Sequence, residues 1–354
     1  MTTLSRWPAM AFMAFVMVSV PTWQDQPSGT AERLRGVAAV DARTAWACGN
    51  RGTVLRTTDG GRRWTPVAVP GAETLDFRDI EALDATIAFV LAIGAGDKSR
   101  IYKTVDGGRH WVPSFTNNDP RAFYDALGFW NAQTGLAVGD PVDGRFAVLT
   151  TSDGGKTWVG VDRSAMPAAL PGEGAFAASG TCLVVGPSAH AWFVTGGAAR
   201  ARVFRSTDGG RTWQVADTPL AAGVASAGGF SVAFADDRHG IVVGGDYRKE
   251  PEKSENAAVT GDGGVTWTRV TPLAGFRSAV TFVPGTRGRG VIATGPAGSD
   301  WSIDGGNTWA PMAGPGFHAL SIAARDGNGW GVGENGRIAR IEGMAAAAKA
   351  ATGK

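Results

Sequence analysis

Short segments rich in β-forming residues alternate with glycine-rich turns along most of the chain. Residues 52–57 and 145–150 precede a recurring turn, whereas residues 64–69 and 213–216 follow it. Segments of this length, bounded by glycine on one side, are typical of β-strands and are too short for ordinary helices. The pattern therefore predicts an all-β fold.

The recurring turn is a hexapeptide of aspartate, two glycines, two variable residues and tryptophan, and it predicts the architecture. The spacing of the copies, 42 to 55 residues, fits one four-stranded blade of a β-propeller for each copy. In each turn the carboxylate can accept backbone N–H groups, glycine accepts positive φ, and the indole covers the blade edge. The hexapeptides therefore read as structural. Their aspartates are Asp59, Asp106, Asp153, Asp208, Asp262 and Asp304.

The two ends of the chain together supply a further blade. Residues 317–322, 329–336 and 337–341 form three more predicted strands after the last hexapeptide, and Thr22-Trp23-Gln24 matches the outer-strand start Thr212-Trp213-Gln214. We therefore predict a seven-bladed β-propeller over residues 21–343, with the seventh blade closed by the N-terminal strand. Such closure hides edge strands that would otherwise pair with other chains. Residues 344–354 are alanine-rich and predict a flexible C-terminal tail.

The first twenty residues differ from everything that follows. Arg6 precedes an apolar run at residues 9–20, which has the length of a signal-peptide core and is too short for an ordinary membrane span. No clean small-residue cleavage site follows, so a signal peptide and an uncleaved N-terminal anchor both remain open. Either one predicts export to the periplasm, the exterior, or the outer side of the membrane.

Composition excludes several classes of function. The formal net charge is +2, and no long segment is dominated by Lys or Arg, so no nucleic-acid partner is expected. The glycine pairs follow strands and do not open nucleotide-binding helices, so no cofactor is expected. The hexapeptides lack the ligand pattern of a calcium loop, and Cys48, Cys182 and the histidines lack metal-site spacing. We expect a monomer.

An alignment of the predicted inner strands points to a binding site at the mouth of the central channel. Each strand is aligned on an apolar residue, namely Leu34, Phe77, Phe123, Phe176, Phe230, Phe276 and Phe317. The next position reads Arg35, Arg78, Tyr124, Ala177, Ser231, Arg277 and His318. Because side chains alternate along a strand, these residues should face the channel together. Arg277, His318, Arg35 and Arg78 would then form a basic arc that Tyr124 extends.

Three guanidiniums around one opening could clamp an anionic ligand or an acidic protein segment. The alternative is internal pairing, for example of Arg78 with Asp79, Glu81 or Asp125. Asp125, next to Tyr124, is also assigned to the binding site, and loops expected on the same rim add Asp140, Asp246 and Tyr247. The charged insertion at residues 248–256 is expected to project into solvent.

The hexapeptides resemble the Asp box of bacterial neuraminidase repeats. Together with residues 123–126 (Phe-Tyr-Asp-Ala) and 139–146 (Gly-Asp-Pro-Val-Asp-Gly-Arg-Phe), they make the chain similar to bacterial propellers related to the photosystem II stability and assembly factor family. The resemblance covers nearly the whole chain after the first twenty residues. It implies a seven-bladed, non-catalytic assembly protein with an arginine patch, for which Arg35, Arg78 and Arg277 are the matching positions.

The competing hypothesis is a sialidase-like or other glycoside hydrolase. A sialidase needs a Phe/Tyr-Arg-Ile-Pro stretch before its first Asp box, and none precedes Asp59. It also needs a tyrosine nucleophile, for which Tyr124 is the candidate nearest the predicted mouth. A glycosidase with two carboxylates would draw on Asp79, Asp125, Glu173 or Asp246. The sequence favours a binding protein without catalytic residues.

Overall fold

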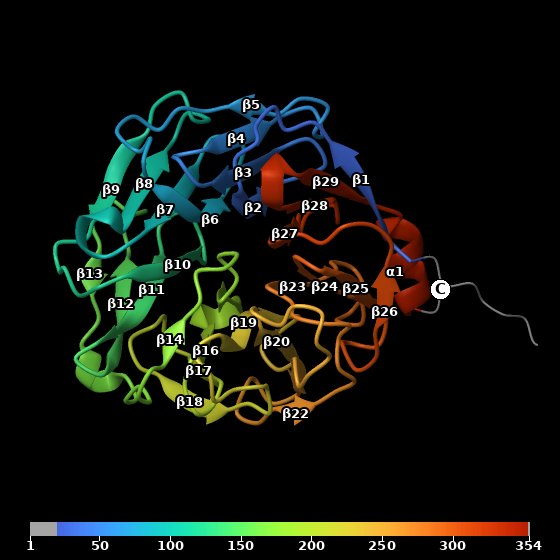
Figure 1. Cartoon of the computed structure of the whole chain (residues 1–354). Helices are drawn as coiled ribbons and strands as arrows, with labels where there is room; N and C mark the ends of the chain where they lie inside the picture. Colours follow the sequence, from blue (N-terminus) through green and yellow to red (C-terminus); the bar gives the residue numbers. More distant parts are fainter. Residues whose placement is uncertain (1–19, 353–354) are drawn as a thin grey trace, which may run out of the picture.

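The computed structural model describes residues 20–352, in which antiparallel sheets follow one another around a ring (Figure 1). Within that range five sheets have four strands and one has nine. The prediction of an all-β fold is confirmed. No helix in the described part of the chain is long and apolar enough to cross a membrane. The predicted signal peptide or anchor lies almost wholly outside the described residues.

Most sheets contain four strands that are consecutive in sequence, because each strand turns back on its predecessor. The first three sheets run β2 (Leu34–Ala39), β3 (Ala45–Gly49), β4 (Val54–Thr57), β5 (Thr65–Pro66); β6 (Asp76–Ala82), β7 (Ala88–Ile93), β8 (Arg100–Thr104), β9 (Val112–Thr116); and β10 (Tyr124–Phe129), β11 (Gly135–Val142), β12 (Arg145–Thr151), β13 (Val159–Gly160). A later sheet has the same order, with β23 (Ala279–Phe282), β24 (Val291–Gly295), β25 (Gly298–Ser302) and β26 (Ala310–Met312).

The nine-stranded sheet lies between them. Its strands are β14 (Gly174–Ala175), β15 (Leu183–Val185), β16 (Ala191–Gly196), β17 (Arg202–Ser206), β18 (Gln214–Asp217), β19 (Ala227–Phe234), β20 (Gly240–Asp246), β21 (Ala257–Thr260) and β22 (Thr268–Arg269). Strand β16 is joined to β19 through a single residue pair, Gly196 and Gly228. Short 3₁₀ turns occupy Gly96–Lys98, Arg163–Ala165, Pro187–Ala189 and Glu334–Gly336.

The last sheet combines the two ends of the chain. Strands β27 (Ala319–Ile322), β28 (Gly329–Val332) and β29 (Ile338–Glu342) are followed by β1 (Thr22–Gln26), which pairs antiparallel with β29 over five residues (Figure 1). The Gln26 side chain fixes this junction. Its Oε1 accepts the indole N–H of Trp64 at 3.1 Å and of Trp330 at 3.0 Å, and its Nε2 donates to the Gly60 carbonyl at 3.0 Å.

Apolar side chains fill the spaces between neighbouring sheets. Trp46 of β3 packs in one cluster with Phe77 of β6 and Tyr102 of β8, and Leu34 of β2 packs with Trp330 of β28. Each of these clusters joins two successive sheets around the ring. Burial of this kind is the main stabilising contribution. The sheets therefore hold one another in position and leave polar residues free to line the centre.

Each Asp-box turn is held by hydrogen bonds within itself. In the third, Asp153 Oδ1 accepts the backbone N–H groups of Lys156 and Thr157 at 2.9 Å, and Thr151 Oγ1 accepts the N–H of Gly155 at 2.8 Å. Hydrogen bonds from the backbone and side chain of Thr157 lower the pKa of Asp153 to about 2. The tight turn leaves these backbone N–H groups without partners in a neighbouring strand, and the carboxylate accepts their hydrogen bonds in place of water.

The alanine-rich C-terminal segment differs from its prediction. Met344–Thr352 forms helix α1, and the side chains of Ala347 and Ala351 are buried. Ala347 packs in a cluster with Ile341 and Trp23. Alanine has the highest helix propensity, and the neighbouring apolar surface gives the helix a face to cover. The expectation of a flexible tail is therefore corrected for residues 344–352.

Residues 176–182, between β14 and β15, leave the sheet and cross the centre of the ring; we call them the crossing segment. The Ala177 carbonyl accepts a hydrogen bond from Arg78 Nη1 at 3.1 Å, and Ser179 Oγ donates to the Ser278 carbonyl at 2.7 Å. A Cβ on Gly180 would lie 2.1 Å from Asp79 Oδ1. The crossing segment therefore touches strands on two distant sides of the ring.

Candidate functional site

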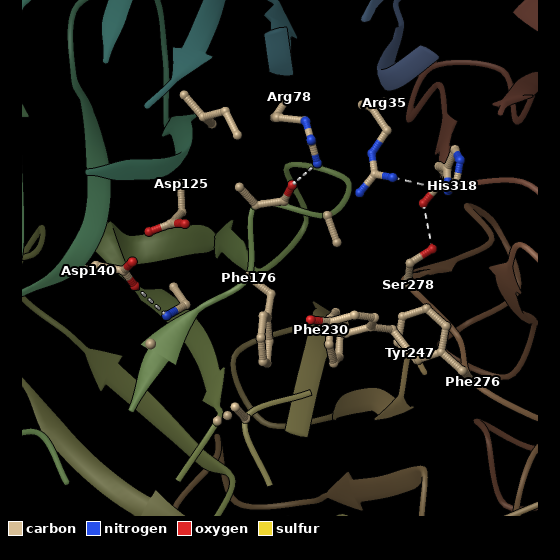
Figure 2. A pocket seen from close by; sticks show the side chains of 18 of the residues that line it. Arg35, Arg78, Asp125, Asp140, Phe176, Phe230, Tyr247, Phe276, Ser278 and His318 are labelled. Carbon is tan, nitrogen blue, oxygen red and sulfur yellow. Dashed lines mark hydrogen bonds between the residues drawn. The ribbon is translucent and has the colours of Figure 1, made fainter. Parts of the chain in front are cut away.

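The candidate site is a cavity of about 610 Å³ at the starts of the inner strands (Figure 2). Arg35 and Arg78 lie along one side, Asp125 and Asp140 along another, and Phe176, Phe230, Tyr247 and Phe276 along a third. Ala177 and Ala178 of the crossing segment also line this cavity. Ser179, Gly180 and Thr181 line a second cavity, of about 450 Å³, together with residues from the far ends of the inner strands. The crossing segment therefore lies between the two.

A β-bulge positions the side chains of the site. In four sheets the pairing of the inner strand with its neighbour skips one residue near the start, and these residues are Arg35, Arg78, Asp125 and Phe230. A bulge residue has no direct partner across the ladder, so its side chain is re-aimed. All four line the cavity. Ser278 and His318, which directly precede β23 and β27, line it as well.

This bulge position corrects the sequence alignment. Arg35, Arg78 and His318 are brought together as predicted, but the third and sixth inner strands were aligned one residue early. The residues that line the cavity there are Asp125 and Ser278, not Tyr124 and Arg277. The fifth inner strand was aligned one residue late, because the bulge there holds Phe230 and not Ser231. The phenylalanine on which the inner strands are aligned does not keep a fixed position relative to the bulge, so the alignment shifts by one residue in three strands.

Tyr124 and Arg277 point into the sheets. The buried Tyr124 ring packs edge-on against Phe115, with ring centroids 5.5 Å apart. Arg277 forms an ion pair with Asp300 of β25, with Nε at 2.7 Å and Nη2 at 2.5 Å from Asp300 Oδ2. Both side chains of that pair are only 2% exposed. The predicted basic arc therefore lacks Arg277 at one end, and Tyr124 does not extend it at the other.

Glycine on the second strand was the signal that could have found the right register. In four sheets a glycine on the second strand faces the backbone of the inner strand. A Cβ on this glycine would lie 1.9–2.4 Å from the carbonyl oxygen two residues before the cavity-lining position. The pairs of glycine and cavity-lining residue are Gly49 with Arg35, Gly139 with Asp125, Gly244 with Phe230, and Gly295 with Ser278. Only glycine tolerates so close a backbone approach. An alignment on these glycines brings the cavity-lining positions into register.

Two guanidiniums dominate the basic side. Arg78 pairs with Asp76 at 2.7 Å, which is not one of the three acidic partners weighed from sequence. Arg35 Nη1 lies 3.4 Å from His318 Nδ1, and within residues 20–352 no carboxylate oxygen lies within 4.0 Å of its nitrogens. The Nε atoms of both arginines are buried without a hydrogen-bond partner. Burial, followed by the charges of Arg78 and Arg33, lowers the pKa of Arg35 to about 9.

His318 is uncharged at neutral pH. Burial and the nearby Arg35 lower its pKa to about 4, against the opposing effect of Glu334, whose Oε1 lies 2.7 Å from His318 Nε2. Because charging the ring costs free energy beside a guanidinium, the imidazole stays neutral and Arg35 keeps its charge. The positive charge on this side therefore comes from arginine alone.

The acidic side consists of Asp125 and Asp140. Asp140 Oδ1 accepts the backbone N–H of Ala175 at 3.0 Å, and burial raises the pKa of Asp140 to about 6. Burial and the charge of Asp140 raise the pKa of Asp125 well above its usual value. Asp79 and Glu173, two other carboxyls considered for catalysis, do not line this cavity; Glu173 is engaged by Arg202 and by Thr195 at 2.6 Å.

Aromatic rings form the third side. Phe176 and Phe230 stack with centroids 4.0 Å apart, and the Tyr247 ring, 41% exposed, stands edge-on to both. Asp246 does not line the cavity; its Oδ1 accepts the backbone N–H of Arg248 at 2.9 Å. The site thus offers positive, negative and apolar surfaces within one opening.

The insertion at residues 248–256 also differs from its prediction. It folds back toward the cavity, where the Glu250 carbonyl accepts the N–H of Phe276 at 2.8 Å and the Glu250 side chain joins the lining. A Cβ on Gly275 would lie 2.2 Å from that carbonyl, so glycine permits the contact. Sequence reasoning missed Glu250, because its charged neighbours are typical of a solvated loop. Within residues 20–352 no cluster of three or more His, Cys, Asp or Glu side chains could hold a metal ion.

Comparisons with known proteins agree with this architecture. The family model of the BNR/Asp-box repeat matches residues 204–215, which include the box that begins at Asp208. A comparison with curated protein sequences finds no match. Among solved structures, YCF48 bound to D1 peptide is similar over 91% of this chain and 99% of its own, at a TM-score of 0.64 and 18% identity.

Two further structures show the range of proteins with this fold. The GH74 xyloglucanase from Xanthomonas campestris is similar over 90% of this chain, at a TM-score of 0.63 and 17% identity, and this chain spans 53% of that one. The WD40 β-propeller domain of Doa1 is similar over 92% of this chain and 98% of its own, at a TM-score of 0.59 and 13% identity. The chain is therefore an Asp-box β-propeller in fold, similar to YCF48.

Proposed function

We propose that this propeller binds a protein segment at the cavity and holds an anionic group of that segment at Arg35 and Arg78. The observation that carries the proposal is the Arg35 guanidinium, which lines the cavity without a carboxylate within ion-pair distance among residues 20–352. A half-buried cation beside a second guanidinium is costly to hold, and an anion relieves that cost.

Three further observations support a binding role. Buried Nε–H donors of Arg35 and Arg78 have no partner, and a carboxylate can accept from such donors. The stacked Phe176 and Phe230 rings offer an apolar surface for a neighbouring side chain of the segment. YCF48, a propeller of similar fold, has been solved bound to a peptide. A docked protein segment can contact the positive, negative and apolar surfaces of the cavity, whereas a small anion contacts only the arginines.

Peptide binding tests this proposal. A labelled peptide with glutamates among alanines should bind in fluorescence anisotropy, its glutamine counterpart should bind about tenfold more weakly, and Arg35→Ala should remove the difference. Arg325→Ala removes an exposed arginine beyond the far end of β27 and serves as the matched control. Free phosphate and citrate as competitors distinguish a small anion from a segment. Equal binding of both peptides to the unaltered protein would refute the proposal.

A glycoside hydrolase is the second candidate, because a GH74 xyloglucanase shares the fold and two carboxyls with raised pKa values, Asp125 and Asp140, line the cavity. A protonated acid beside an ionised one is the pairing that glycosidases use. The sialidase form is disfavoured, since Tyr124 is buried away from the cavity. Hydrolysis of xyloglucan or of fluorogenic glycosides and sialosides that Asp140→Asn abolishes would place this candidate first.

We further infer that the ring has seven blades and that the N-terminal strand closes the seventh. The single Gly196–Gly228 pair divides the nine-stranded sheet into two units, whereas neighbouring strands share up to four pairs in one unit and up to seven in the other. Pairing of β1 with β29 supports the closure. Export, proposed from the apolar run at residues 9–20, and a monomeric state stay predictions; secretion assays and light scattering test them.

A further inference from the structure

The cavity carries opposite charges at equivalent places around the ring. The bulge position holds arginine in β2 and β6 but Asp125 in β10 (Figure 2). Asp125 is only 1% exposed, and its Oδ2 is buried without a hydrogen-bond partner. A buried polar atom without a partner is rare in native proteins and costs free energy unless a ligand supplies that partner. Asp125 therefore presents an unused acceptor beside the cavity.

Asp140 brings a second carboxyl to the same wall. The two carboxyls lie near each other in Figure 2, across the cavity from Arg35 and His318. Within residues 20–352 neither forms an ion pair with a Lys, Arg or His side chain, so the protein supplies no cation to them. A Cβ on Gly174 would lie 2.8 Å from Asp140 Oδ1, so glycine gives this carboxyl its room. The wall is thus built to keep two carboxyls at the cavity without a counter-charge.

We propose that Asp125 and Asp140 form a subsite for the cationic group of a lysine or arginine side chain on the bound segment. The inference rests on the proposed function, since the same segment occupies both subsites. The partner would carry an acidic group for Arg35 and Arg78 and a basic group for the aspartates, with apolar contact to Phe176 and Phe230 between them. Such a bipolar segment is recognised by the order and spacing of its charges, not by net charge.

The protonation states suit this role. At neutral pH Asp140, with a pKa of about 6, is mostly ionised, and burial and the charge of Asp140 raise the pKa of Asp125 well above its usual value. Asp140 therefore supplies a negative charge that one ammonium or guanidinium group can neutralise, and the Asp125 carboxyl adds an acceptor beside it. The apolar surroundings that raise both pKa values also strengthen the attraction for a cation, because solvent screens it less.

Other titratable groups near the pair are accounted for. The Cys182 thiol, whose pKa is raised by burial and by these carboxyls, stays protonated. Asp79, with a pKa of about 7, lies against Gly180 in the crossing segment. Glu173, just before β14, is engaged by Arg202, and Glu250 lines the cavity with a pKa raised by burial and by Glu334.

Calorimetric titration with three blocked peptides tests the proposal on the full chain. One peptide carries a glutamate and a lysine separated by a phenylalanine spacer, a second replaces lysine by norleucine, and a third replaces glutamate by glutamine. We expect the unaltered protein to bind the first peptide about tenfold more tightly than the second, and Asp140→Asn to remove that advantage. Asp217→Asn, which disrupts an exposed pair with Arg200, is the matched control.

The pH dependence gives a readout that loss of folding cannot imitate. Between about pH 5 and about pH 7.5 Asp140 loses its proton, so affinity for the lysine peptide should rise while affinity for the norleucine peptide stays level. His318 remains neutral and Arg35 charged across this range. The same rise in the double variant Asp125→Asn with Asp140→Asn would assign it to Glu250 or Asp79 and overturn the proposal.

The peptides also separate this inference from the proposed function. Equal affinity for the lysine and norleucine peptides, with glutamate still required, would refute the cation subsite and leave the anion subsite standing. Binding that depends on lysine but not on glutamate or Arg35 would refute the anion subsite instead.

Discussion

Replacing Arg277 should damage stability and spare binding. Arg277 and Asp300 are each 2% exposed, and the arginine donates to Asp300 Oδ2 at 2.7 Å through Nε and to the Phe276 carbonyl at 2.9 Å through Nη1. Arg277→Met removes the cation and leaves a buried carboxylate. Breaking one side of a buried ion pair costs about 3–5 kcal/mol.

The double variant Arg277→Met with Asp300→Leu supplies the internal check. It removes both charges together, so most of the lost free energy of unfolding should return. Burial already raises the pKa of Asp300 against the lowering effect of Arg277, so the single variant should also lose less stability in acid, where the orphaned carboxyl takes a proton.

Urea unfolding followed by tryptophan fluorescence measures these differences, since the chain has 13 tryptophans. Anisotropy with the glutamate peptide measures binding by the folded fraction, and Arg325→Met is the exposed control. The reasoning fails if Arg277→Met unfolds within about 1 kcal/mol of the unaltered protein, or if it loses peptide binding while it remains folded.

Three further predictions concern the ring and its centre. Gln26→Leu should lower the free energy of unfolding by about 1–3 kcal/mol, because the indole N–H groups of Trp64 and Trp330 lose their acceptor. Gln26→Glu keeps an acceptor oxygen, so equal urea midpoints for the two variants would contradict the prediction. Gly180→Ala should cost about 1–3 kcal/mol in the same measurement, since φ is +77° and its Cβ would meet Asp79 Oδ1; an unchanged midpoint would show that the crossing segment moves freely. Burial raises the pKa of Asp79 to about 7, so its contribution to stability is present below about pH 4 and is lost as pH rises through about 7. The melting temperature of Asp79→Asn should therefore rise relative to that of the unaltered protein between pH 4 and pH 8. A constant difference between the two melting temperatures over this range would contradict the prediction.

Repeats and termini were readable from sequence because their signals are local. The box at Asp153 and the match of Thr22-Trp23-Gln24 to an outer strand each depend on neighbouring residues and strand propensity. The sequence does not predict which side chains from different strands pack against each other. Asp300 lies 23 residues from Arg277 in the next hairpin, and nothing in either segment distinguishes that buried pair from an exposed one.

The bulge shows why the site was only half predicted. One skipped residue reverses the direction in which every later side chain of a strand points, so an error of one position exchanged Asp125 for Tyr124. Arg35 and Arg78 were found because their preceding Leu34 and Phe77 happen to occupy the same register. The acidic wall depends on contacts between β10, β11 and β14, which no single strand encodes.

The crossing segment forms a floor for the cavity, because Ala177 and Ala178 line it and Ser179, Gly180 and Thr181 line the second cavity behind them. A segment bound as we propose would enter and leave on the side of the ring where the inner strands begin, not on the side of the Asp-box turns. Release of such a segment would therefore not require the hydrogen bond between Arg78 and the Ala177 carbonyl to break.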